Sequence, residues 1–323
     1  MRGAERRVYY YDVELGTNKK DASPPPMVDV INAIATRYEE SKASHSINKD
    51  TATLEIGDML IDEEEGHALL LVQISDRTAP DPYLSNPIEG TSRVVRKEEG
   101  EGRGFGAHLL VSLTAEPETP NTYRVLLEKN TGLHRSHVNR LLHAILRTLY
   151  QEDPTVFTCD HAGGQRTREG LPKQVEFRPM LEFTGHPSES LIQELEQGEL
   201  KEISLIHNEQ QGPLGGRAWL QKEERILKVK AKFTNRVRNV WQNLQAVFAA
   251  QAQAGYEHAR IKFKTQDGES ASVDIDTATG NTLLHDKYVK SRRITDIDPP
   301  MDESSDEIVE HFATKLIELF SED

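Results

Sequence analysis

Two short segments alternate apolar residues with lysine or arginine, a pattern that suits contact with phosphate groups. The first segment is 225–233 and the second is 259–264. Successive side chains of a strand point to opposite faces, so each segment predicts a strand with one apolar and one cationic face. The cationic faces consist of Lys228, Lys230 and Lys232 in the first strand, and of Arg260, Lys262 and Lys264 in the second.

The residues between these strands predict a helix over 235–254 that ends at Gly255. Its buried stripe is expected to contain Val237, Val240, Trp241, Leu244, Val247 and Phe248. Arg236 and Arg238 lie in its first turn, where the helix dipole disfavours a cation by roughly 0.3–1 kcal/mol. A local preference that is broken in this way points to a function, here the binding of an anion.

These cations form the candidate site, together with more distant residues that extend the surface. The complete set is Lys228, Lys230, Lys232, Arg236, Arg238, Arg260, Lys262, Lys264, Lys290, Arg292, Arg293 and Arg103. A simpler interpretation also stays open, because the solvent side of a half-buried strand is usually polar and lysines protect sheet edges from unwanted pairing.

Charge is distributed unevenly along the chain, which carries a net charge of −14. Residues 225–293 hold 13 lysines and arginines against 6 acidic residues, a balance of +7. Residues 296–323 hold 10 acidic residues and one lysine, a balance of −9. Such asymmetry is more informative than the total. The acidic end of the chain could fold over the basic segment and compete with a ligand.

The pattern of elements predicts an α+β fold, with mixed or antiparallel sheets, packed helices, two lobes and a long mobile loop. We expect an N-terminal lobe at 1–160 with its loop at 76–106, a C-terminal lobe with the basic sheet at 161–300, and an acidic helix at 301–323. The last helix is expected to begin at the capping box Ser304–Glu307. Its apolar stripe would dock on its own core or on a second copy of the chain.

The remaining elements follow from apolar periodicity and turn residues. Strands are expected at 6–14, 53–61, 67–75, 108–113, 123–128, 175–183, 202–207 and 271–276, and helices at 27–41, 136–150 and 187–196. We expect 53–61 to pair with 67–75, 108–113 with 123–128, and 261–264 with 271–276. The continuous apolar run 69–72 predicts a central, buried strand, and 151–174 is expected to be an exposed loop or a domain boundary. The helix 136–150 exposes Arg140, His143 and Arg147, and its N-terminus carries His134, Arg135 and His137. Free N–H groups at such a helix start can also bind phosphate.

Several protein classes are disfavoured by the sequence. No apolar run reaches the ~20 residues that span a bilayer, the N-terminus is charged, and Cys159 is the only cysteine, so a cytoplasmic location is expected. His134, His137, Cys159 and His161 match no zinc pattern, and no metal or cofactor is expected. Nuclease, P-loop, serine-hydrolase and zinc-protease motifs were not found, and we expect a protein that is not an enzyme.

The order of elements resembles the A protein of the phage lambda Rex exclusion system and the related B component of the Kiwa phage-defence system. The resemblance is carried by the acidic-turn hairpin within 53–75, by His108-Leu-Leu-Val111 followed by 123–129 and a helix, and by Lys228-Val-Lys-Ala-Lys-Phe233 followed by a helix and 259–264. It implies a cytoplasmic homodimer that binds double-stranded DNA without sequence preference and defends against phage. A membrane-protein partner encoded nearby is also implied.

We therefore predict a sequence-independent double-stranded DNA-binding protein of a bacterial or prophage anti-phage defence system, acting as sensor or effector. Binding would rest on contacts to phosphates, which attract and position DNA but do not distinguish bases. Two alternatives stay open. One is a nuclease-like effector that uses the same basic surface, and the other is a protein-interaction module whose basic sheet meets an acidic partner.

Overall fold

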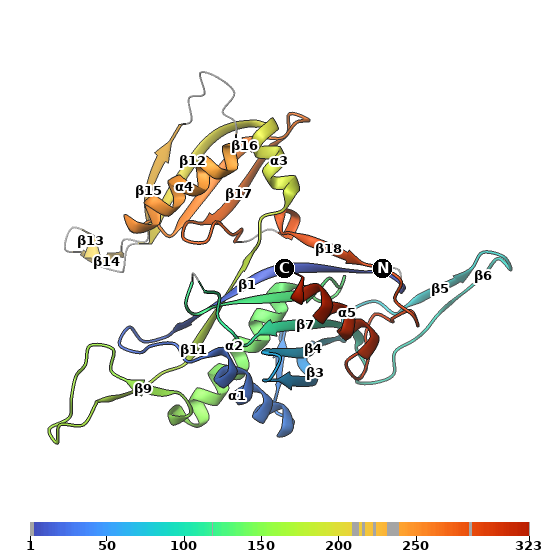
Figure 1. The fold of residues 1–323 in the computed structure, drawn as a ribbon. Coiled ribbons are helices and arrows are strands. Elements are labelled where there is room, and N and C mark those ends of the chain that lie inside the picture. Colours follow the sequence, from blue (N-terminus) through green and yellow to red (C-terminus); the bar gives the residue numbers. More distant parts are fainter. Residues whose placement is uncertain are drawn as a thin grey trace. The chain divides into compact units, whose positions relative to one another are not determined.

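The computed structural model describes residues 3–117, 119–208, 213–214, 217–221, 224–230, 239–283 and 286–322. The chain forms two compact units, Met1–Phe183 with Arg292–Asp323 and Thr184–Ser291, which we call unit 1 and unit 2 (Figure 1). Helices and mostly antiparallel strands occur in both units, which confirms the predicted α+β class.

Unit 1 is built on one large sheet in the order β11-β1-β8-β7-β4-β3-β2, with β18 also pairing with β1. Its strands are β1 (Arg6–Thr17), β2 (Ser44–Ile47), β3 (Ala52–Asp62), β4 (His67–Asp76), β7 (Arg103–Ser112), β8 (Thr122–Glu128), β11 (Pro179–Gly185) and β18 (Ser291–Ile294). The predicted pairing of β3 with β4 and of β7 with β8 is confirmed. Strand β2 was not anticipated.

The central position of β4 explains why its apolar residues are continuous rather than alternating. Leu69, Leu70, Leu71 and Val72 are all buried, and β4 pairs with a strand on each side. A strand covered on both faces has no polar side, so every position favours an apolar residue. The sequence prediction of a central, buried strand is therefore confirmed.

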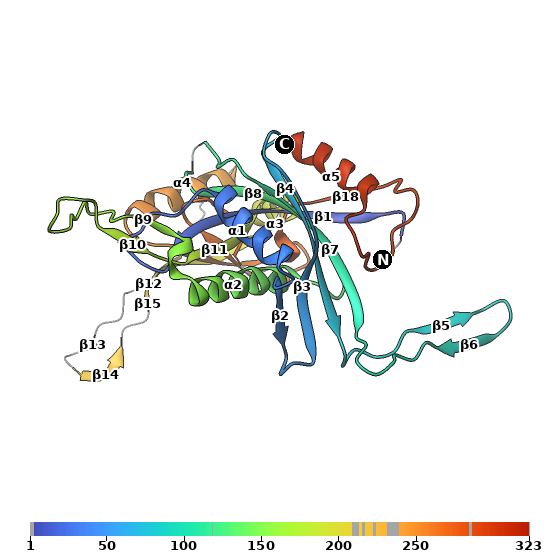
Figure 2. The same ribbon diagram turned by 90° about the horizontal axis from the view of Figure 1, so that it is seen from below.

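Helices cover both faces of this sheet (Figure 2). On one face, α1 (Met27–Glu39) and α2 (Arg135–Glu152) pack against side chains that include Leu70, Leu109 and Val111. On the other, α5 (Glu310–Ser321) places Phe312 and Leu316 against Leu69, Leu110 and Leu126. The final helix thus docks on its own core.

The predicted start of the final helix at Ser304 is wrong, because α5 begins at Glu310. The preceding residues are held by other partners instead. The Gly106 N–H donates to the Glu303 carbonyl at 2.9 Å, and the Ile308 N–H donates to Asp58 Oδ2 at 2.8 Å. Backbone groups that bond to the sheet are unavailable for a first helical turn, so the capping box remains unused.

A buried polar network fastens this C-terminal segment to the sheet. Arg6 Nε lies 2.7 Å from Glu128 Oε1, and His108 Nδ1 lies 2.7 Å from Glu128 Oε2. The Val309 N–H donates to His108 Nε2 at 3.1 Å. Arg6 also donates to the carbonyls of Met301 and Asp302 at 2.8 Å. Buried charges are tolerated when they are paired and fully hydrogen-bonded in this way.

Two segments that were predicted as loops contain hairpins. Within 76–106, β5 (Tyr83–Asn86) pairs with β6 (Thr91–Val94), and β7 already begins at Arg103. Within 151–174, a 3-10 turn (Pro154–Val156) leads to β9 (Thr158–Asp160), which pairs with β10 (Gln174–Glu176).

The sequence places a domain boundary between residues 160 and 161, whereas the first segment of unit 1 continues to Phe183. The two boundaries differ because β11 joins the sheet of unit 1.

Unit 2 contains a four-stranded antiparallel sheet in the order β15-β12-β16-β17. Its elements are α3 (Glu189–Gln197), β12 (Glu199–Asn208), β13 (Pro213–Leu214), β14 (Arg217–Gln221), β15 (Glu224–Val229), α4 (Val240–Gln253), β16 (His258–Lys264), β17 (Ser270–Asp276) and a 3-10 turn (Asp286–Tyr288). The predicted hairpin of β16 and β17 and the end of α4 before Gly255 are both confirmed.

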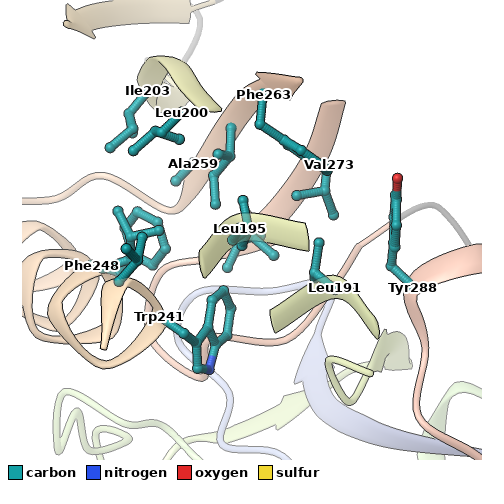
Figure 3. Packing of buried hydrophobic residues seen from close by; sticks show 14 of the residues in the cluster. Leu191, Leu195, Leu200, Ile203, Trp241, Phe248, Ala259, Phe263, Val273 and Tyr288 are labelled. Carbon is teal, nitrogen blue, oxygen red and sulfur yellow. The ribbon is translucent and has the colours of Figure 1, made fainter. Parts of the chain in front are cut away.

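Helices α3 and α4 cover one face of the unit 2 sheet. Trp241 and Phe248 of α4 and Leu195 of α3 pack over Ile203 and Phe263 of the sheet (Figure 3). Val247, which was expected in the buried stripe of α4, is 46% exposed, whereas Val240 and Leu244 are buried as predicted. Val237 lies outside the described residues.

Candidate nucleic-acid interface

The strand β16 presents its cations as the sequence predicted. Ala259, Ile261 and Phe263 are buried in the core below α3 and α4. Arg260, Lys262 and Lys264 are exposed on the opposite side. We call this opposite side of the unit 2 sheet the open sheet face, and define it by Lys228, Arg260, Lys262 and Lys264 together with Glu199, Glu202 and Asp274.

The neighbouring basic strand β15 differs from its prediction. It spans Glu224–Val229, and residues 231–233 of the predicted strand lie outside the described residues. Its apolar residues Leu227 and Val229 are 45% and 40% exposed. The reason is its place at the edge of the described sheet, where β12 is its one described neighbour and none of its residues belongs to the core cluster under the helices. Lys228 and Lys230 are exposed. Lys232, Arg236 and Arg238 lie outside the described residues.

The register of the strands places acidic residues beside the predicted cations. Lys262 lies opposite Glu202 of β12, and Arg260 lies opposite Asp274 of β17. Arg260 forms a two-pronged ion pair with Asp274, with Nε–Oδ1 and Nη2–Oδ2 distances of 2.7 and 3.1 Å. Lys262 Nζ lies 3.1 Å from Glu202 Oε1. The hydrogen bond from Lys262 is the main reason that the pKa of Glu202 is lowered.

Three lysines of this region lack a direct ion pair, although Lys228 and Lys264 contribute from a distance to the lowered pKa values of Glu202 and Glu199. Lys228, Lys230 and Lys264 make no ion pair with any residue that the structure describes. Lys264 lies opposite Glu199 in the register, but Glu199 bonds to Lys201, which is the first cause of its lowered pKa. Lys228 lies opposite Ser204, a neutral residue.

The more distant members of the predicted site are divided between the two units. Arg103, Arg292 and Arg293 belong to unit 1, whereas the sheet belongs to unit 2. Each is paired with an acid, at 3.0 Å for Arg103–Glu303, 3.3 Å for Arg292–Glu322 and 3.5 Å for Arg293–Glu5. Two of these acids come from the acidic end of the chain. Lys290 belongs to unit 2, where its backbone N–H donates to the His186 carbonyl at 2.7 Å.

A second group of cations lies in unit 1, outside the site that the sequence predicted. Arg140 and Arg147 were recognised as exposed positions of the helix α2, but His45 of β2 and Arg178, just before β11, were not singled out. We call this group the α2 cationic face and define it by Arg140, Arg147, Arg178 and His45. Only the exposed helical spacing of Arg140 and Arg147 was visible in the sequence.

Other features of the described residues concern metals and membranes. His134 and His137 stack with a centroid distance of 5.6 Å, and the His134 N–H donates to His137 Nδ1 at 3.3 Å, so this pair caps α2. Within the described ranges there is no group of three or more His, Cys, Asp or Glu residues placed to hold a metal ion. Among the described helices, none has the length and apolar character needed to cross a membrane.

Comparisons with known proteins give no relative for this chain. No protein-family model, no curated protein and no solved structure matches it.

Proposed function

We propose that the chain binds double-stranded DNA without sequence preference through the open sheet face of unit 2. The observation that supports this best is the row of exposed cations on β15 and β16, extended by Lys230, which directly follows β15 and which we now include in the open sheet face. Lys228, Lys230 and Lys264 are free of ion pairs with described residues. Lysines at the surface of a rigid sheet contact phosphate oxygens and leave the base edges unread.

The acids of this face bear on the strength of binding. Glu202 and Asp274 already neutralise Lys262 and Arg260, so the net attraction rests on the three unpaired lysines. Each phosphate that is neutralised releases counterions, and the logarithm of affinity falls with the logarithm of salt with a slope of about −0.9 per contact. Three contacts predict a slope of about −2.7.

The biological setting of this proposal comes from the resemblance to the Rex and Kiwa proteins. It supports a role as sensor or effector of anti-phage defence in a bacterium or prophage. It also supports a cytoplasmic homodimer and a membrane-protein partner encoded nearby. In such a setting, binding to any sequence is useful because the invading genome is not known in advance.

Fluorescence anisotropy on two labelled duplexes of unrelated sequence, titrated at several salt concentrations, tests the proposal. We expect equal affinity for both duplexes and a steep loss of affinity as salt rises. Replacing the three unpaired lysines (Lys228→Ala, Lys230→Ala and Lys264→Ala) is expected to weaken binding at least tenfold at low salt.

The matched control removes three exposed lysines of unit 1 (Lys19→Ala, Lys20→Ala and Lys173→Ala) and changes net charge by the same amount. If both triple variants weaken binding equally, the effect reflects net charge and the open sheet face is not the interface. Wild-type protein that binds neither duplex at low salt refutes the proposed function.

A second candidate function, a protein-interaction module, is favoured by the edge strand β15. Ile226, Leu227 and Val229 are 46%, 45% and 40% exposed on a strand that has a single neighbour among the described strands. An extended peptide can add to such an edge by backbone hydrogen bonds and cover these side chains. A defined protein partner whose binding is lost in Leu227→Lys, together with no DNA binding, would favour this candidate.

A further inference from the structure

The helix α2 lies between two edge strands of the unit 1 sheet. It contacts β2 on one side, and it bonds along β11 on the other. Arg135 Nη1 donates to the Phe183 carbonyl at 2.6 Å, and His143 Nε2 lies 2.7 Å from the Leu181 carbonyl. The outward side of α2 is therefore bordered by residues from both ends of the sheet.

Three arginines and one histidine lie along this outward side, and the histidine becomes a cation only when it is protonated at low pH. Arg140 and Arg147 are exposed and seven residues apart, so two helical turns bring them to the same face, about 10 Å from each other along the axis. His45 approaches from β2, close enough to both arginines that they contribute to its lowered pKa, after burial as the largest cause. Arg178 approaches from the other side, and Arg147 contributes to its lowered pKa, again after burial.

No carboxylate among the described residues forms an ion pair with these cations. The acid at the end of α2, Glu152, is held by Arg37 at 2.5 Å, and this hydrogen bond is the main reason for the lowered pKa of Glu152. His137 shows the same environment, because burial, His134 and Arg140 together lower its pKa. Like charges that are packed together without a counter-charge repel each other, and a bound anion would relieve this repulsion.

Arg178 adds a second, independent indication that this face lacks acceptors for its cations. Its Nε is buried and has no hydrogen-bond partner among the described residues, and its Nη2 contacts only the sulfur of Met180, at 3.1 Å. Buried N–H groups nearly always have an acceptor. A guanidinium presents its donors as a planar fork that matches two oxygens of a phosphate.

We propose that the α2 cationic face is a second surface for the phosphate backbone of double-stranded DNA, separate from the open sheet face. This inference rests on the DNA binding that the proposed function assigns to the chain, and it adds a contact in the other unit that does not depend on the open sheet face. One DNA strand presents a phosphate every 3.4 Å of axis, so the arginines of α2 span about three phosphates. Extended contact of this kind suits a duplex better than a single phosphorylated side chain.

The buried side of α2 holds these cations in place. Val138, Leu141, Leu142, Ile145, Leu146 and Leu149 are all buried against the unit 1 core. The backbone that carries Arg140 and Arg147 is therefore fixed before any ligand arrives. Ligand binding then orders only the ends of these side chains, which limits its entropic cost.

The test compares wild type with the variant Arg140→Gln, Arg147→Gln and Arg178→Gln in the same anisotropy titration. We expect at least a tenfold loss of affinity at about 100 mM salt, and a salt slope reduced by about 2.7, since three contacts are removed. The matched control is Arg77→Gln, Arg96→Gln and Arg168→Gln, which removes three exposed arginines elsewhere in unit 1. The control is expected to retain the wild-type slope.

The outcomes separate this inference from the proposed function. If the α2 variant binds like wild type while the open-sheet lysine variant loses affinity, the inference is overturned and the proposed function stands. If only the α2 variant loses affinity, the inference stands and the open sheet face is excluded as the interface. If wild type binds no duplex, both are overturned.

Two controls accompany the titrations. A thermal melt of each variant verifies that it folds. Replacing Arg140, Arg147 and Arg178 by lysine in place of glutamine is expected to restore part of the affinity, since lysine keeps the charge.

Discussion

The open sheet face and the α2 cationic face have similar cations but opposite surroundings. On the open sheet face, Arg260 and Lys262 are paired with carboxylates of neighbouring strands. On the α2 cationic face, Arg140 and Arg147 lie near His45 and Arg178, whose pKa values are lowered by burial first and by these arginines in addition. The comparison shows that the number of lysines and arginines on a surface does not determine its attraction for an anion. The neighbouring acids determine it as well.

The largest effect is expected when both faces are neutralised together. The combined variant Lys228→Ala, Lys230→Ala, Lys264→Ala, Arg140→Gln, Arg147→Gln and Arg178→Gln is expected to lose DNA affinity more than a hundredfold. The residues belong to different units and share no described partner, so their effects on binding free energy are expected to add. Anisotropy at low salt measures the sum, and a combined loss no greater than that of one triple variant would contradict independent contacts.

A smaller effect is expected from removing the acids of the open sheet face. The double variant Glu202→Gln and Asp274→Asn releases Lys262 and Arg260 for phosphate contact. We expect DNA affinity to rise roughly three- to tenfold, with a salt slope steeper by about 1.8. The control Glu99→Gln with Glu169→Gln removes the same charge from exposed positions of unit 1. An equal gain in the control would show that only net charge matters.

The α2 cationic face is also expected to make stability depend on pH. Because folding lowers the pKa of His45 and His137, the unfolded chain binds protons at a higher pH than the folded chain. Stability from these groups is present above the unfolded pKa of about 6.5 and is lost as pH falls through it towards the lower folded pKa. Thermal melts between pH 7.5 and 5.5 should show a smaller loss for His45→Gln than for wild type, by on the order of 1 °C. Parallel curves for the two proteins would contradict this account.

The smallest effect is expected from relieving repulsion on the same face. Arg147→Gln removes a cation that faces both His45 and Arg178, and is expected to raise the melting temperature by about 1 °C. Arg37→Gln is the contrasting variant, because Arg37 has acidic partners in Glu40 and Glu152, and its loss should lower the melting temperature. A lower melting temperature for Arg147→Gln would contradict the idea that Arg147 is repelled by His45 and Arg178 in the folded protein.

Elements were predicted correctly from the sequence where the side that carries the regularly spaced apolar residues is also the side that is buried. The strand β16, its hairpin with β17, and the buried stripe of α2 follow directly from alternation or helical spacing. The predicted burial was wrong at β15, where the apolar alternation is present but none of the described helices covers the apolar side. Propensity and pattern specify which face a residue takes, whereas burial depends on a further layer that comes from elsewhere in the chain.

The charge environment of the site could not be predicted for a related reason. Lys262 and Glu202 are paired although 60 residues separate them, and His45 and Arg178 reach α2 from segments more than 100 residues apart. Strand order and register determine which distant residues become neighbours, and neither can be inferred from a local sequence pattern. The start of α5 was missed similarly, since the bond from Ile308 to Asp58 links residues 250 positions apart.

The arrangement of the two units along the chain has a consequence for biosynthesis. Unit 2 interrupts the sequence of unit 1, so the ribosome completes it before it makes α5. Leu69, Leu110 and Leu126 are synthesised early, whereas the residues that cover them, Phe312 and Leu316, follow the whole of unit 2. At a synthesis rate of about 5–20 residues per second, this sheet face stays uncovered for roughly 10–40 s. During that time the nascent chain displays an apolar surface suited to holding by a chaperone.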